Sequence, residues 1–335
     1  MEVPCVAVDR ADGEQTRQAL AKAGVLSDDY QIIHDDGTLY IPVTDSAGVP
    51  DGFETTFRAL PARQTVQTPA DILGYEPSLE RLGDVVIVDE DDSERAHEIA
   101  EAVMAADLPV RSVLNRASKI KGELRVRDWQ LLAESDDSEV DRSPTETVHR
   151  EYGHEFLLDL DAVYFSPRLA TERNRVVQQI QPGEHVLDMF AGVGPFAIPA
   201  ASRGAEVVAV DLNETAIGYL RENASRNKVV DRITAISGDV REVATDYQGW
   251  ADRLVMNLPH SANEFVETAV DLASEECMLH YYDIQHDSDP FGPGIETIRA
   301  AAEPDYEVTV ETEHIVRSYA PHELNVCLDV RLSRR

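Results

Sequence analysis

The segment VLDMFAGVGPFAI, residues 186–198, constrains the fold of this chain more than any other stretch. Its apolar start predicts a buried strand, and Gly192 and Gly194 predict a tight turn, because glycine adopts backbone angles that other residues avoid and lets a ligand approach the backbone closely. Pro195 suits the first turn of a helix. The segment therefore predicts a strand, a glycine turn and a helix start in an α/β fold.

Acidic residues around this turn indicate which ligand it binds. Asp211 lies 19 positions after Gly192, the spacing expected when a second parallel strand ends beside the first, where a carboxylate can bind a ribose. Where a dinucleotide site has a third glycine, this chain has Phe196 or Ala197, and Asp188 would repel phosphates. We therefore predict S-adenosylmethionine, a cationic nucleoside without phosphate. A glycine turn in an unrelated α/β protein is the alternative.

From about residue 153 the pattern alternates between strands and helices and ends in two long strands with no helix between them. This predicts a Rossmann-like, mostly parallel sheet with one antiparallel edge strand. Ligands bind at the carboxyl ends of such strands, and the fourth strand ends in Asn257-Leu258-Pro259-His260. The Asn257 amide and a backbone carbonyl stiffened by Pro259 could accept hydrogen bonds from the planar N–H edge of a base. The predicted cofactor contacts are Asp188, Phe190, Gly192, Gly194, Asp211, Asp239 and Asn257.

Two small α+β domains are expected before this sheet, because each region shows a few strands and one helix between polar stretches. The predicted organisation is a domain over 1–60, a linker over 61–79, a domain over 80–133, an acidic linker over 134–152, and the sheet domain over 153–335.

Composition limits the possible partners and environment. The net charge is −33, from 63 acidic and 30 basic residues, and no acidic tail accounts for it. This indicates adaptation to a saline, halophilic cytoplasm, where salt screens charge. The sequence shows no signal peptide and no apolar run long enough to span a membrane, so a soluble, cytoplasmic protein is expected. The cysteines and histidines lack metal-ligand spacing, so we expect no metal site.

Two local exceptions to the acidic charge predict contact with RNA. Residues 111–127 carry six basic side chains against Glu123, a net charge of +5. Residues 164–173 combine aromatic rings that could stack on a base with arginines and one carboxylate. A solvated strand face and a dipole-stabilised helix start are the alternatives. The predicted RNA contacts are Arg111, Arg116, Lys119, Lys121, Arg127, Arg168 and Arg173.

Motifs distributed along the whole chain resemble those of one known family. They are GEQTR, KGELRVR, VYFSPRLATER, DMFAGVGPF, Asp-Val-Arg-Glu at 239–242, NLPH, LHYYDI and RSYAPHE. Together they closely resemble the archaeal and eukaryotic tRNA (guanine-37-N1)-methyltransferases. The resemblance implies a class I S-adenosylmethionine-dependent methyltransferase domain after two smaller domains. It also implies tRNA as the partner, with the first domain at its outer corner and the others at the anticodon loop. We expect a monomer.

The same resemblance implies roles for particular residues. The family's catalytic arginine falls on Arg125, as a donor to guanine O6, and its general base falls on Glu172. Tyr164, Asn257 and Pro259 match further catalytic positions. These roles are chemically coherent, because guanine N1 must lose its proton before it can attack a sulfonium, and the charge that develops on O6 needs a hydrogen-bond donor.

Other functions remain open from the sequence. A related wyosine-pathway enzyme could transfer the aminocarboxypropyl group or act as a bifunctional methyltransferase. A non-catalytic tRNA-binding protein would keep the fold with a degenerate cofactor site. A small-molecule methyltransferase would leave the first 150 residues and the basic segment unexplained.

Overall fold

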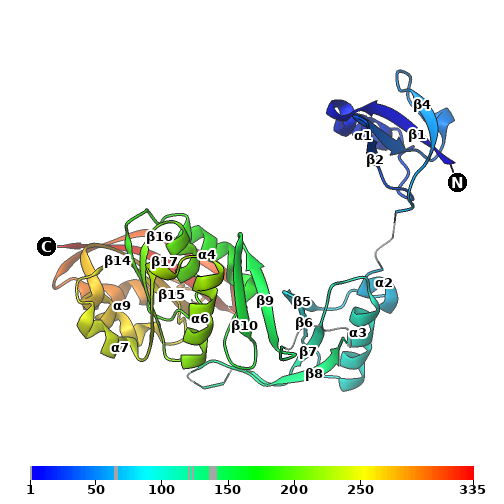
Figure 1. Cartoon of the computed structure of the whole chain (residues 1–335). Coiled ribbons are helices and arrows are strands. Elements are labelled where there is room, and N and C mark those ends of the chain that lie inside the picture. The colour runs from blue at the N-terminus through cyan, green and yellow to red at the C-terminus, as the bar shows by residue number, and fades with distance from the viewer. Residues whose placement is uncertain (1, 64–66, 120, 123, 136–141) are drawn as a thin grey trace. The chain divides into compact units, whose positions relative to one another are not determined.

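The structure is a computed structural model that describes residues 2–63, 67–119, 121–122, 124–135 and 142–335. The chain divides into two compact units, Met1–Gln67 and Thr68–Arg335, both drawn in Figure 1. In the described ranges no helix is both long and apolar enough to cross a membrane.

The first unit is an antiparallel sheet with one helix. Its elements are β1 (Glu2–Asp9), α1 (Gly13–Lys22), β2 (Ile33–Asp35), β3 (Thr38–Pro42) and β4 (Thr55–Ala59), with strand order β2-β3-β1-β4. Val6 of β1, Leu20 of α1 and Ile41 of β3 pack together in a buried core. Because α1 packs against the sheet in this way, the unit has a hydrophobic core of its own.

The second unit begins with a four-stranded sheet. Its elements are α2 (Pro69–Leu73), β5 (Leu79–Leu82), β6 (Val85–Val88), α3 (Ser93–Ala105), β7 (Ser112–Arg116) and β8 (Trp129–Glu134), in the order β5-β6-β7-β8. The central strands β6 and β7 are parallel and α3 connects them, as a crossover requires. Asp92 caps α3 by accepting hydrogen bonds from the backbone N–H groups of Glu94 and Arg95.

Both expected linkers contain regular structure. Helix α2 lies within 61–79, and strand β9 (Glu146–Glu151) lies within 134–152, where it forms a hairpin with β10 (His154–Asp159). Residues 64–66 and 136–141 of these linkers lie outside the described residues. Two side chains of β9 that point inward, Thr147 and Glu151, are polar, which explains why apolar periodicity did not predict this strand.

The large sheet has the order β13-β12-β11-β14-β15-β17-β16. Its strands are β11 (His185–Asp188), β12 (Glu206–Asp211), β13 (Ile233–Ser237), β14 (Ala251–Met256), β15 (Ala273–His286), β16 (Tyr306–Ala320) and β17 (Glu323–Arg334), and its helices are α4 (Ala170–Val177), α5 (Ala197–Ser202), α6 (Glu214–Arg226), α7 (Val240–Val243), α8 (Val266–Leu272) and α9 (Gly292–Ala302). Strands β11 to β15 pair in parallel, and β17 runs antiparallel between β15 and β16. The predicted fold class is confirmed, with the reversed strand one place in from the edge.

Alternation along the strands builds two cores, one on each face of the sheet. Val186 of β11 packs in the core that contains residues of α5 and α6, whereas the next residue, Leu187, packs in the core that contains residues of α8 and α9. Successive side chains of a strand point to opposite faces, so the continuous apolar strands of the sequence fit a sheet covered on both sides. Because helices cover both faces of the sheet, a ligand is expected to bind at the carboxyl ends of the strands.

Candidate active site

The glycine turn after β11 has the predicted geometry. Gly192 and Gly194 have φ angles of 51° and 92°, in the region that favours glycine. A Cβ on Gly194 would approach Ile198 Cγ1 to 3.0 Å, whereas a Cβ on Gly192 would lie 3.9 Å from the Tyr164 carbonyl oxygen. Gly194 is therefore needed for packing as well as for the turn, and Gly192 brings the turn next to Tyr164.

Two acidic side chains follow from the ends of neighbouring strands. Asp211, at the end of β12, accepts hydrogen bonds from Gly192 N at 2.7 Å and Asn213 N at 2.8 Å. Asp188 is 1% exposed, and burial raises its pKa to about 8, with a smaller raising effect from the charge of Asp211. Asp188 Oδ2 has no hydrogen-bond partner among the described residues. A buried carboxyl group with an unused acceptor suits a cationic ligand such as S-adenosylmethionine.

The other predicted cofactor contacts lie near the same strand ends. Asp239 follows β13 and caps α7 by accepting a hydrogen bond from Arg241 N at 2.9 Å. The hydrogen bond from the Arg241 side chain lowers the pKa of Asp239, so this carboxylate is ionised. The ring of Phe190 meets the edge of Phe265, with the centroids 5.0 Å apart.

Residues of three separate motifs meet around Tyr164. The Arg125 guanidinium lies over the Tyr164 ring, 5.5 Å from its centroid, and Arg125 Nε is buried with no hydrogen-bond partner among the described residues. Arg125 has a φ of 56°, which is uncommon for a residue with a side chain. Burial lowers the pKa of His260, and the nearby charge of Arg125 lowers it further. The KGELRVR loop, the VYFSP segment and the NLPH box thus share one region.

The NLPH box leaves the end of β14. Asn257 is half-buried and directly follows the buried Met256. The Pro259 carbonyl accepts a hydrogen bond from Ile284 N at 3.2 Å. This bond fixes the box against β15, and because a carbonyl oxygen has two lone pairs, the Pro259 oxygen keeps the capacity for a second hydrogen bond.

Glu172 lies in the first turn of α4 and is 4% exposed. Arg175 donates two hydrogen bonds to its carboxylate, at 2.8 and 2.9 Å, and the Tyr282 hydroxyl donates a third at 2.7 Å. The Tyr282 ring lies 6.2 Å from that of Phe196, which follows the glycine turn. Glu172 is therefore an oriented, buried carboxylate close to the elements that form the predicted cofactor site.

Two predicted RNA contacts are buried inside the protein. Arg111 is 7% exposed and pairs with Asp84 and Glu134. Arg173 is 3% exposed and forms two hydrogen bonds to Glu151, at 2.8 and 2.5 Å. Neither guanidinium can reach a phosphate in this structure, and we correct the predicted RNA surface by leaving both residues out of it. A run of charge in a sequence does not tell which members point inward.

The remaining basic residues are more accessible. Lys119 is exposed, and Lys121 is exposed beside its partner Asp128. Arg127 is half-buried over the Trp129 ring. Arg116 and Arg168, from β7 and from the turn before α4, both pair with Glu80. These last two residues therefore connect the four-stranded sheet to the segment that carries Glu172.

The charged residues behind Glu172 were not predicted from the sequence. Arg175 also binds Asp329, at 2.5 and 3.0 Å, and Asp329 accepts a hydrogen bond from His280 Nδ1 at 2.6 Å. His280 and Asp329 occur in the apolar strands CMLHYYDI and VCLDVRL. Charged residues are rarely buried unless they are paired, so this pattern could have indicated an internal network.

Among the described residues, two groups of side chains have atoms close enough to share a metal ion, although the sequence predicted no metal site. His280, Cys327 and Asp329 are buried beside Arg175, and Arg253 binds His280 at 2.6 Å, so positive charge already fills this group. The exposed group is His286, Asp287 and His322. Asp287 Oδ2 there lies 3.0 Å from His322 Nδ1, a hydrogen bond that needs no metal.

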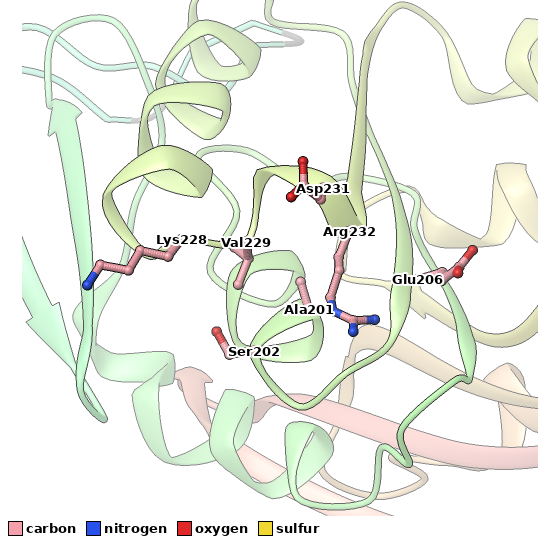
Figure 2. Close-up of a pocket in the computed structure, with 7 residues that line it drawn as sticks. All are labelled: Ala201, Ser202, Glu206, Lys228, Val229, Asp231 and Arg232. Carbon is pink, nitrogen blue, oxygen red and sulfur yellow. The ribbon is translucent and has the colours of Figure 1, made fainter.

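Figure 2 shows a pocket in a different part of the domain. Its lining residues are Ala201, Ser202, Glu206, Lys228, Val229, Asp231 and Arg232. Glu206 begins β12, whereas Asp211 ends it. The pocket therefore lies toward the amino ends of the strands and includes none of the predicted site residues.

The sheet order, the glycine turn and the acidic strand ends define a class I methyltransferase. The family model for the TRM5/TYW2 methyltransferase domain matches residues 147–311, the tRNA methyltransferase 5 N-terminal domain matches 5–51, and the TYW2 N-terminal domain matches 68–137. The chain belongs to the TRM5/TYW2 methyltransferase family.

Relatives of two activities share this architecture. The tRNA (guanine(37)-N(1))-methyltransferase Trm5b of Pyrococcus abyssi is 38% identical, over 98% of each chain, and its crystal structure superposes with a TM-score of 0.70. The structure of aTrm5 in complex with tRNALeu is 32% identical, covers 98% of this chain and 99% of the other, and has a TM-score of 0.73. A tRNA(Phe) (4-demethylwyosine(37)-C(7)) aminocarboxypropyltransferase of Pyrococcus horikoshii is 34% identical over 75% of this chain and 88% of the relative.

Proposed function

We propose that the protein transfers a methyl group from S-adenosylmethionine to N1 of guanosine 37 in tRNA. The observation that carries the proposal is the meeting of Arg125, Tyr164 and the glycine turn, since the Arg125 guanidinium lies over Tyr164 and the Tyr164 carbonyl lies beside Gly192. These residues come from separate motifs, and their convergence supports a site where a base and a methyl donor meet.

Each side chain has a distinct role in this reaction. S-adenosylmethionine supplies the methyl group when it is bound. Glu172 accepts the proton from guanine N1, which lets the N1 lone pair attack, and general-base catalysis of this kind contributes roughly 10²- to 10⁴-fold. Arg125, whose Nε has no hydrogen-bond partner among the described residues, donates to O6 as negative charge develops there. Asn257 and Pro259 hold the N–H edge of the base, and Tyr164 orients Arg125.

The proposed RNA surface combines the accessible basic residues with the expected domains. Lys119, Lys121 and Arg127 lie in or beside the loop that carries Arg125, and Arg168 lies four residues before Glu172. Phosphate contacts there would hold the anticodon loop over the site. The first unit would contact the outer corner of the tRNA, and the enzyme would act as a cytoplasmic monomer.

Aminocarboxypropyl transfer is the second candidate, because residues 68–137 match the TYW2 N-terminal domain. The first unit favours N1 methylation, since the N-terminal domain of tRNA methyltransferase 5 matches residues 5–51. A buried, oriented carboxylate also suits removal of a proton from guanine N1.

Mass mapping of the product separates these functions. Wild-type protein is incubated with S-adenosylmethionine and an unmodified tRNA transcript, and the nucleosides are then identified by mass spectrometry. We expect one methyl group on guanosine 37 and no product with a control transcript that has adenosine there. Gain of an aminocarboxypropyl group supports the second candidate, and cofactor binding without any product excludes both.

A further inference from the structure

We infer that Arg175 and Asp329 are positioning residues that set how strongly Glu172 holds a proton, and that Glu172 Oε2 is the oxygen that receives the proton from the base. The inference rests on the proposed function, in which Glu172 is the general base. It concerns an ion-pair chain from α4 into β17 that neither the motifs nor the family assignment describes.

The hydrogen bonds to Glu172 distinguish its two oxygens. Oε1 accepts from Arg175 Nη2 at 2.9 Å and from the Tyr282 hydroxyl at 2.7 Å. Oε2 accepts from Arg175 Nε at 2.8 Å, and its other neighbour is His314 Nε2 at 3.2 Å. A carboxylate oxygen has about two lone-pair sites, so Arg175 and Tyr282 together use the full capacity of Oε1.

His314 is the partner of Glu172 that can most easily be displaced. Its side chain is 39% exposed, whereas Tyr282 is 1% exposed and is held in β15. A base that enters from solvent can take the place of the imidazole without disturbing the other three hydrogen bonds. The N1–H bond would then break as an O–H bond forms on Oε2, the electron pair stays on N1, and the proton later passes to solvent.

Arg175 divides its charge between two carboxylates. Besides Glu172 it binds Asp329, with Nη1 to Oδ2 at 2.5 Å and Nη2 to Oδ1 at 3.0 Å. Burial alone would raise the pKa of Asp329, but hydrogen bonds from His280 and Arg175 outweigh it and hold this pKa well below its usual range. Asp329 is therefore a permanent negative charge behind Arg175.

This arrangement balances two needs of a general base. An arginine bound only to Glu172 would orient the carboxylate but would also stabilise its ionised form and weaken it as a proton acceptor. The charge of Asp329 offsets part of that effect while the two-pronged geometry stays in place. Arg175 can then orient Glu172 without fully suppressing its basicity.

Several other charged or titratable groups face the Glu172 carboxylate, and their effects on the pH–rate profile must be distinguished from its own. They are His314 on β16, Tyr282 and His280 on β15, Cys327 on β17, and Arg253 on β14 through His280. Burial raises the pKa values of Tyr282 and Cys327 and lowers that of His280, so these groups keep their protons or stay neutral near neutral pH. His314 contacts Glu172 directly, so a variant of His314 is needed as a control.

The test is the pH dependence of the single-turnover methylation rate with saturating S-adenosylmethionine. The acidic limb of this pH–rate profile is the range at low pH over which the rate rises with pH. Arg175→Gln removes the positive charge and should move the acidic limb to higher pH by about one unit or more. Asp329→Asn removes the negative charge behind Arg175 and should move the limb to lower pH by a smaller amount, with a slower plateau. Arg175→Lys keeps the charge and should leave the limb in place while the plateau rate falls.

Two controls exclude simpler explanations. Asp84→Asn removes a half-buried partner of the buried Arg111 beside the four-stranded sheet, and it should lower the melting temperature without moving the limb. His314→Gln should also leave the limb in place. Limbs that do not move in opposite directions in Arg175→Gln and Asp329→Asn, or a limb that His314→Gln abolishes, would overturn the inference.

The outcomes also separate this inference from the proposed function. If wild-type protein forms no N1-methylguanosine, the proposed function fails. If wild-type protein methylates normally but the two limbs do not move in opposite directions, only the inference fails. If Asp329→Asn does not fold, the comparison of Arg175→Gln with Arg175→Lys decides alone, because only the change that removes charge should move the limb.

Discussion

Burial controls the chemistry of Asp188 at the glycine turn. Its pKa of about 8 lies far above the usual range of a carboxyl group, first because the side chain is buried and then because Asp211 is close. Between about pH 4 and about pH 8, Asp188 therefore keeps a proton in the folded protein that it has already lost in the unfolded chain. Without a ligand, the contribution of Asp188 to stability is full below that window and is lost as the pH rises through about 8.

A cationic ligand reverses this preference, so binding of S-adenosylmethionine should release a proton from Asp188. We expect the dissociation constant to fall roughly tenfold or more between about pH 6 and about pH 8. Isothermal titration in buffers of different ionisation enthalpy measures both the affinity and the proton release. Asp188→Asn should bind more weakly and lose the pH dependence, and an unchanged dependence in this variant would contradict the assignment.

Prediction of single residues from the sequence succeeded where a local feature, such as a turn, determines the residue type. Gly192 and Gly194 were predicted from the turn, and both have positive φ angles. Arg175 and Asp329 were not predicted, because their pairing joins positions 154 residues apart and depends on the fold. Arg111 and Arg173 were expected at the surface, and only the structure reveals that both guanidinium groups are buried and paired with acidic side chains.

At the scale of elements, Glu80 joins two parts of the second unit. This residue of β5 binds Arg116 of β7 and also Arg168, at 3.0 Å, from the turn before α4. Its side chain is 15% exposed, so the two guanidinium groups share one shielded carboxylate. The contact ties the four-stranded sheet, next to the loop of Arg125, to the helix of Glu172.

Loss of this carboxylate should therefore destabilise the protein. We expect Glu80→Gln to lower the free energy of unfolding by about 1–3 kcal/mol, because two arginines would then lie close together without their shared partner. Denaturant unfolding measures the change. The control is Glu222→Gln, which breaks an exposed pair with Arg226 within α6 and should cost less than about 0.5 kcal/mol. Equal changes in the free energy of unfolding in the two variants would show that Glu80 stabilises the protein no more than an exposed ion pair does.

The sequence predicted the elements of the large sheet better than those before it. Strands β11, β12 and β14 have apolar central residues. The first two end in an aspartate and Asn257 directly follows the third, so their type and order could be derived. Strand β9 could not, because its buried Thr147 and Glu151 are held by Asp84 and Arg173 rather than by apolar contacts.

At the scale of the whole molecule, the net charge of −33 opposes both folding and RNA binding. Lys119, Lys121, Arg127 and Arg168 lie in or beside the segments that carry Arg125 and Glu172, while acidic residues are spread through the whole chain. At molar salt the screening length falls to about 3 Å, which removes most repulsion between exposed carboxylates. The protein is then expected to be most stable and most active in concentrated salt.

We expect the melting temperature and the tRNA methylation rate to increase together as KCl rises from about 0.1 M toward about 3 M. The melting temperature is measured without tRNA, so that the effect on folding is separated from the effect on RNA binding. A methylation optimum at the low end of this range, with a melting temperature that does not depend on salt, would contradict adaptation to a saline cytoplasm.

Glu172 is proposed as the base in methylation of guanine N1, and single-turnover kinetics of Glu172→Gln are the sharpest test of that role. Glutamine keeps the size of the side chain and can still accept hydrogen bonds from Arg175 and Tyr282, but it is a far weaker proton acceptor. We expect the rate of methyl transfer by Glu172→Gln to be at least about 100-fold lower than that of the wild type, with dissociation constants for tRNA and S-adenosylmethionine close to the wild-type values. A rate within about threefold of the wild type, at matched pH and with unchanged binding, would contradict it.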